Sequence, residues 1–217
     1  MPPRAVWDGV TDRSCYRQRE VERRDRLADA ARAGDWSAVF GWLDANPGLV
    51  NVGRVGGSSG YTVLHQAAWH GTDVGTAERL LDLGAWRTLR AGSGERAIDI
   101  AERRGHRHLV SMLRPVIRHP VPPDVLGGLQ RQLHALVEQR AGELIRKHAA
   151  RLPQLGPLTE LENPQFWFPV PRMYGGFSYR LDGMELVVDS WCRVVGGSGQ
   201  THRVMADGIQ LVESGWG

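Results

Sequence analysis

A recurring unit constrains this chain more than any other feature of its sequence. Three alanine-containing segments each end at a glycine, and Gly34, Gly71 and Gly105 lie 37 and 34 residues apart. Glycine ends helices well because it adopts the left-handed backbone conformation without steric cost. A short apolar segment follows each glycine, at residues 39–43, 77–81 and 109–113. A repeat of this length is typical of proteins built from stacked units, so the sequence predicts three helix pairs.

The central unit carries a family resemblance. Residues 62–68 read TVLHQAA, with Gly71 soon after, and this resembles the T-P-L-H-x-A signature of the ankyrin repeat family with Val63 in place of the proline. The resemblance covers about residues 22–118 as three repeats; in the third, Arg96 stands for the threonine and Asp99 for the histidine. It implies a short all-α solenoid that binds other proteins.

The whole chain is expected to be α+β. Residues 1–20 show no hydrophobic period and are expected to form a loose N-terminal arm, although Trp7 and Tyr16 could fold back. Residues 21–118 hold the repeats. Apolar residues recur at helical spacing within 119–152, which predicts a capping amphipathic helix of about 24 residues starting near Asp124. Glycine-centred turns in 153–217 predict a small antiparallel β-meander of four or five strands, covered by that helix.

Composition narrows the class of protein. No apolar run approaches the roughly 18 residues of a membrane span, and no leader peptide is visible, so no membrane association is expected. The two cysteines lie far apart, which favours a reducing cytoplasm. The formal charge is only +3, and Lys147 is the single lysine among many arginines, a bias that suggests GC-rich bacterial coding. We therefore expect no nucleic-acid partner.

The resemblance also assigns a partner-binding surface. In ankyrin repeats the variable positions of the first helices and the finger loops contact the partner. In this sequence the equivalent residues are Asp29, Arg32, Gln66, Trp69, His70, Trp86, Arg103 and Arg104. A central aromatic residue flanked by arginines is enriched at binding hot spots. We expect a protein partner that offers an acidic or aromatic-bearing segment. The alternative is that Trp69 only packs against a neighbouring repeat or the arm.

The C-terminal strands offer a second candidate site. If Val195 pairs with Gln200, then Asp189, Arg193 and His202 share one face and are candidate catalytic residues for an acid–base or anion-holding site. The same three side chains also suit solvent-facing ion pairs. Cys192 falls on the opposite face in this register, so it is not expected to act as a nucleophile with His202.

Two rivals to protein binding by the repeats remain open. The aromatic residues Trp167, Tyr174, Tyr179 and Trp191 could line a pocket between the repeats and the sheet, as in a small-molecule enzyme or ligand-binding protein. The sheet could instead form a homo-oligomer through an edge strand. No H-E-x-x-H or C-x-x-C motif is present, so no metal or cofactor is expected. A non-catalytic role is preferred.

Overall fold

The computed structural model describes residues 5–193 and 197–215, and within them the fold is α+β. The chain divides into two compact units. We call Tyr16–Val116 the helix unit, and residues 5–15 together with 117–215 the sheet unit. Among the described residues no helix combines the length and the apolar character needed to cross a membrane.

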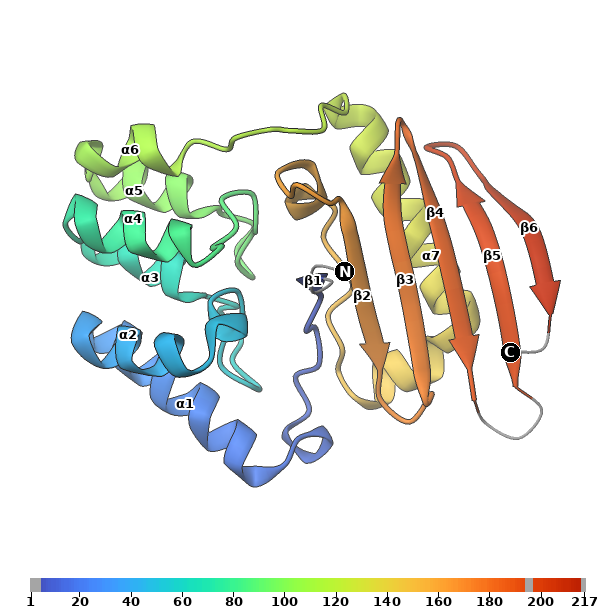
Figure 1. Ribbon diagram of the computed structural model, residues 1–217, viewed down its shortest axis with the longest axis horizontal. Helices are drawn as coiled ribbons and strands as arrows, with labels where there is room; N and C mark the ends of the chain where they lie inside the picture. Colours follow the sequence, from blue (N-terminus) through green and yellow to red (C-terminus); the bar gives the residue numbers. More distant parts are fainter. Residues whose placement is uncertain (1–4, 194–196, 216–217) are drawn as a thin grey trace. The chain divides into compact units, whose positions relative to one another are not determined.

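The helix unit contains three helix pairs that follow one another along the chain (Figure 1). The first helices of the pairs contact one another in sequence, and so do the last two second helices. The helices are α1 (Gln18–Ala33), α2 (Trp36–Ala45), α3 (Val63–His70), α4 (Val74–Asp82), α5 (Ala97–Arg104) and α6 (Arg107–Leu113), with the 3-10 turn η2 (Pro47–Leu49) after α2.

A glycine ends the first helix of every pair. Gly34, Gly71 and Gly105 have φ angles of 74°, 64° and 77°, the left-handed values that other residues adopt only with strain. A histidine of the next pair lies over the first two glycines: His70 Nε2 bonds to the Arg32 carbonyl at 3.0 Å and His106 Nε2 to the Trp69 carbonyl at 3.2 Å. These contacts link each helix pair to the one before it.

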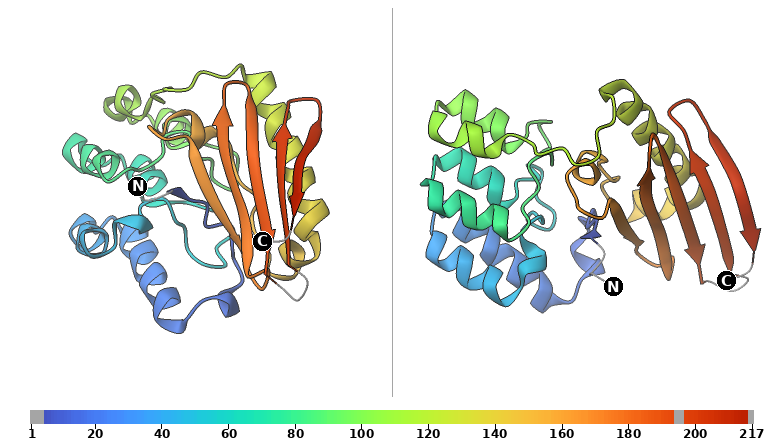
Figure 2. Two further views of the ribbon diagram at one scale, coloured as in Figure 1. Left: turned by 45° about the vertical axis from the view of Figure 1, so that its right-hand side comes forward. Right: turned by 45° about the horizontal axis from the view of Figure 1, so that its top comes forward.

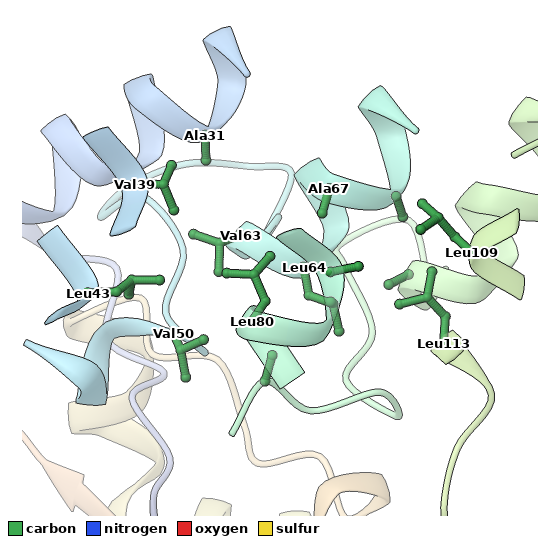
Figure 3. Close-up of a cluster of buried hydrophobic side chains, with 14 of the residues drawn as sticks. Ala31, Val39, Leu43, Val50, Val63, Leu64, Ala67, Leu80, Leu109 and Leu113 are labelled. Atoms are coloured by element: carbon green, nitrogen blue, oxygen red, sulfur yellow. The ribbon is translucent and has the colours of Figure 1, made fainter. Parts of the chain in front are cut away.

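Small and branched apolar side chains hold the pairs together. Ala67 and Ala68 of α3 are buried, and their short side chains let α3 and α5 approach closely. Larger side chains from all three pairs fill the remaining space, and Figure 3 shows Leu43, Leu64, Leu80 and Leu109 among them. Full burial of one such leucine contributes about 1.5–3 kcal/mol. The core therefore runs continuously through the stack.

The sheet unit contains a six-stranded sheet in the order β1-β2-β3-β4-β5-β6. Strands β2 to β6 form the antiparallel meander expected from the sequence, and β1 joins its edge in parallel to β2. The elements of this unit are β1 (Ala5–Val6), η1 (Arg13–Cys15), α7 (Pro123–Lys147), η3 (Gly156–Thr159), β2 (Gln165–Val170), β3 (Gly175–Asp182), β4 (Glu185–Cys192), β5 (Ser198–Val204) and β6 (Ile209–Gly215).

Helix α7 covers one face of this sheet, as all three views in Figures 1 and 2 agree. Its apolar side chains, including Leu129, Leu133 and Val137, are fully buried, as are Phe166 and Val188 of the strands. A side chain at Gly128 would collide with Ala206, because a Cβ there would lie 2.7 Å from the Ala206 carbonyl oxygen. Glycine at this position therefore allows the helix to approach the β5–β6 turn.

The N-terminal arm is not loose over the described residues 5–15, because Trp7 folds back: its Nε1 donates to the Arg151 carbonyl at 2.9 Å, and the Arg151 N–H donates to the Gly9 carbonyl at 2.7 Å. The segment around Phe166 forms strand β2 although it contains a proline. Pro169 is tolerated there because β1 pairs only with Phe166 and Trp167, which leaves the edge beside Pro169 open.

Candidate functional site

Trp69 stands out on the helix unit because it is the large apolar side chain of α3 that the stack does not bury. It occupies the last turn of the helix, where its side chain is 37% exposed, while the preceding residues Val63–Ala68 mostly face the core. Tyr61, just before the helix, meets the indole edge-on with ring centroids 6.4 Å apart. The indole is thus supported on one side by another aromatic ring.

Two arginines of α5 complete the surroundings of Trp69. The Arg104 guanidinium lies 4.2 Å from the ring centroid and that of Arg103 lies 5.7 Å away. Arg104 also donates from Nε to the Trp69 carbonyl at 3.3 Å. Attraction between a guanidinium and an exposed aromatic face is worth about 0.5–1 kcal/mol. We call Tyr61, Trp69, Glu95, Arg103 and Arg104 the Trp69 cluster.

The cluster carries a net positive charge. Arg103 pairs with Glu95 at 2.7 Å, and this hydrogen bond lowers the pKa of Glu95, so both groups remain charged at neutral pH. Arg104 forms no ion pair with any residue that the structure describes. The exposed Arg32 of α1 adds a second positive charge to the layer of first helices. An acidic group on a partner would therefore find complementary charge beside an aromatic surface.

The remaining residues predicted for partner binding lie elsewhere on the helix unit. Asp29 is ion-paired with Arg54, a residue of the loop after α2. Gln66 is half-buried, and the ring of His70 lies edge-on to Trp36 at 6.1 Å between centroids. The Trp86 N–H donates to Asn51 Oδ1 at 2.8 Å in the connector after α4. Among the eight predicted residues, Trp69 contacts Arg103 and Arg104, and the His70 ring contacts the Arg32 carbonyl.

Sequence reasoning did not select Tyr61 and Glu95, the other members of the cluster. Both precede a helix of a repeat, at positions that the variable-position rule does not include. Tyr61 lies directly before the Thr62 cap of α3, and Glu95 directly before Arg96, which caps α5. The sequence did contain a signal for them: each lies directly before the N-cap of a first helix, in successive helix pairs.

The candidate catalytic residues on the sheet do not meet, because the strand register differs from the expected one. Val188 pairs with His202 and Asp189 with Thr201, a shift by an odd number of residues that moves every β5 side chain to the other face. His202 is buried on the face covered by α7, whereas Asp189 lies on the opposite face. The expected partner Val195 lies outside the described residues.

The environments of these groups also differ from one another. Burial, followed by the nearby charge of Arg140, lowers the pKa of His202. Asp189 accepts a hydrogen bond from the Thr201 hydroxyl at 2.8 Å, and Arg193 is exposed just beyond the end of β4. Cys192 pairs with Ser198, four positions along β4 from the partner of His202. The sheet thus holds neither of the two sites considered from the sequence.

Of the four aromatic residues predicted to line a pocket, two are in contact with each other and the other two lie elsewhere. Trp167 and Trp191 stack at 4.5 Å between centroids on the face opposite α7. They meet across β3 because Gly176 has no side chain there: a Cβ would lie 2.9 Å from the Trp167 ring. Tyr179 is fully buried on the other face and Tyr174 is 69% exposed in a turn. Within the sheet unit these four side chains therefore do not share one face.

A hollow of about 250 Å³ does lie over β4 to β6, lined by Asp189, Trp191, Thr201 and Glu213 among others. It is shallow and open to solvent. Another cavity, between α1 and α3, has about 20 Å³ of free space, room for about one water molecule. Neither is a closed pocket of the size that small-molecule sites have.

Comparisons with known proteins add no assignment. No model of a known protein family matches this chain, and a search of curated proteins finds no match to it.

Proposed function

We propose that this chain is a non-catalytic ankyrin-repeat protein that binds an acidic, aromatic-bearing segment of a protein partner through the Trp69 cluster. The observation that carries the proposal is the exposed Trp69 ring held between Tyr61 and the guanidinium groups of Arg103 and Arg104. Tryptophan and arginine are the residue types most enriched where interfaces gain their affinity. Two free cysteines fit a bacterial cytoplasm as the place of action.

Charge and shape make different contributions in this proposal. Arg104 and Arg32 would attract carboxylates of the partner, which speeds association and makes it sensitive to salt. Trp69 would bury its remaining exposed surface against an apolar or aromatic side chain of the partner. Because Tyr61 and Arg104 already hold the indole in place, little side-chain entropy is lost when the partner binds.

Labelled peptides test the proposal directly by fluorescence anisotropy. The set contains acidic peptides with and without one tryptophan or tyrosine, and neutral and basic peptides with the same aromatic residue. We expect the acidic aromatic peptides to bind most tightly. Trp69→Ala should weaken that binding by about 30-fold or more, the effect of losing one hot-spot residue. Arg104→Ala should weaken it less and reduce its dependence on salt.

A matched control comes from the other layer of helices. The guanidinium of Arg79 lies 4.0 Å from the Phe40 ring centroid and pairs with Asp44. Arg79 therefore also contacts an aromatic ring, as Arg104 does, but it belongs to α4, the second helix of its pair. Arg79→Ala should leave peptide binding unchanged. The proposal fails if no peptide of the acidic aromatic class binds, or if Arg79→Ala and Arg104→Ala weaken binding equally.

A further inference from the structure

Three side chains with metal-binding atoms converge in the sheet unit. Cys15 Sγ lies 3.2 Å from His148 Nδ1, and Asp12 Oδ2 lies 3.1 Å from the same nitrogen. The third edge of the triangle, from Cys15 Sγ to Asp12 Oδ2, measures 3.6 Å. One thiol, one imidazole and one carboxylate thus direct one atom each toward a common point.

The backbone holds these three groups in place before any ligand arrives. Asp12 directly precedes the short turn η1 and Cys15 is its last residue, and the Asp12 N–H donates to the His148 carbonyl at 3.3 Å. Ser14 donates to Asp12 Oδ1 from both its N–H and its hydroxyl, which leaves Oδ2 directed toward His148. His148 caps the C-terminal end of α7 and is only 6% exposed. Thr11 adds a hydrogen bond to the Ala149 carbonyl.

We propose that Asp12, Cys15 and His148 bind a zinc ion. Tetrahedral zinc with bonds of about 2.0–2.3 Å to oxygen, nitrogen and sulfur separates its ligand atoms by about 3.3–3.6 Å. The triangle described above, with edges of 3.1 to 3.6 Å, is close to one face of that tetrahedron. Thiolate and imidazole ligands together favour zinc over magnesium or calcium, which prefer oxygen alone.

The same three residue types also make up catalytic Cys-His-Asp triads, but the geometry differs. In a triad the carboxylate holds one nitrogen of the imidazole so that the other nitrogen can take the proton of the nucleophile. Here Cys15 and Asp12 both contact Nδ1, and Nε2 is buried without a hydrogen-bond partner among the described residues. The thiol and the carboxylate therefore both lie beside Nδ1, so the three atoms can surround one metal ion, whereas a triad needs them on different nitrogens.

A bound zinc would join parts of the chain more than 130 residues apart, tying the N-terminal segment to the end of α7. Three protein ligands leave a fourth position for water or for a group from another molecule. Asp12 and Cys15 are half-buried and not enclosed, so solvent can reach that position. This role is independent of partner binding by the helix unit.

The test uses the full chain, stripped with a chelator and then titrated with Co²⁺ as a spectroscopic substitute and with Zn²⁺ against a chromophoric competitor. We expect one ion per chain and a near-ultraviolet thiolate-to-cobalt charge-transfer band. Cys15→Ser should abolish that band and lower zinc affinity by at least about 100-fold. Loss of a residue that only supports a ligand lowers metal affinity by up to about 100-fold, so loss of a ligand itself should cost at least as much. Asp12→Asn should lower the affinity and keep the band.

Cys192→Ser is the matched control, because Cys15 and Cys192 are the two cysteines of the chain. It should keep the band and the affinity, and circular dichroism shows whether each variant is folded. The proposal is overturned if the wild-type chain binds no zinc tighter than the Cys15→Ser variant does. It is equally overturned if the charge-transfer band depends on Cys192 instead of Cys15.

Discussion

The helix unit and the sheet unit differ in how strongly local sequence specifies their contacts. In the helix unit the same contact recurs: His70 lies over Gly34 and His106 over Gly71, each bonded to the carbonyl two residues before the glycine. In the sheet unit each strand pair has its own register, set by a turn and by the face that α7 buries. Because its contacts repeat, the helix unit can be predicted from the sequence. The sheet unit has no such repeat, so its strand registers depend on long-range packing.

The largest expected effect is the response of the helix unit to acid through the buried ring of His65. Burial of His65 lowers its pKa to about 4, with weaker opposition from the Leu89 carbonyl and Glu95. The unfolded chain binds this proton near pH 6.5, so the contribution of His65 is complete above that pH and is lost as the pH falls through 4. We expect the helix unit to lose about 3 kcal/mol of unfolding free energy between pH 7 and pH 4 from this group.

Denaturant unfolding followed across that pH range measures the loss. His65→Gln removes the titrating ring, so the free energy of unfolding of the variant should fall less steeply with acid than that of the wild type. Equal slopes for wild type and His65→Gln would contradict the buried, neutral state of His65.

A smaller effect tests the repeated glycine contact. Alanine at Gly71 must adopt a φ of 64° and would place its Cβ 2.3 Å from His106 Nδ1, whereas nothing lies within 4 Å of a Cβ at Gly105. We expect Gly105→Ala to cost about 1–2 kcal/mol from backbone strain alone. Gly71→Ala should cost about 1 kcal/mol more, because His106 must give up its bond to the Trp69 carbonyl. Similar losses in thermal unfolding would show that the two pairs do not pack as described.

The smallest effect concerns the sheet unit and has the opposite sign. The Tyr179 hydroxyl is buried against α7 without a hydrogen-bond partner among the described residues, and burial raises the pKa of this group well above its usual value. Tyr179→Phe removes the unsatisfied polar atom and should raise the free energy of unfolding by about 1 kcal/mol. Tyr174→Phe, at an exposed turn, should change it by less than about 0.5 kcal/mol. A destabilised Tyr179→Phe variant would reveal a partner for the hydroxyl.

Much of the architecture was predictable from local patterns. The glycine period located the helix pairs, apolar spacing located α7, and glycine turns located the antiparallel strands. The register between β4 and β5 was not predictable, because the loop that joins Cys192 to Ser198 is longer than the expected turn, and an odd shift reverses the faces. The convergence of Asp12 and Cys15 on His148 was equally hidden, since no local motif connects residues so distant in sequence.

The candidate sites divide along the same line. Trp69, Arg103 and Arg104 were selected correctly as neighbours because they occupy equivalent positions of adjacent repeats, which stack at a fixed distance. Asp189 and His202 were grouped by an assumed strand pairing, and one wrong turn length separated them. Residues grouped from the sequence lie in contact where successive helix pairs fix the distance between them.

Site-specific photo-crosslinking in living cells tests the central claim most directly. A photoreactive amino acid replaces Arg32 or Gln66 in the layer of first helices, and Glu78 or Ser111 on the second helices serves as the comparison. Binding at the Trp69 cluster predicts that positions 32 and 66 capture the same partner and that positions 78 and 111 do not. Capture from the second helices alone, or unchanged capture from position 66 after Trp69→Ala, would contradict it.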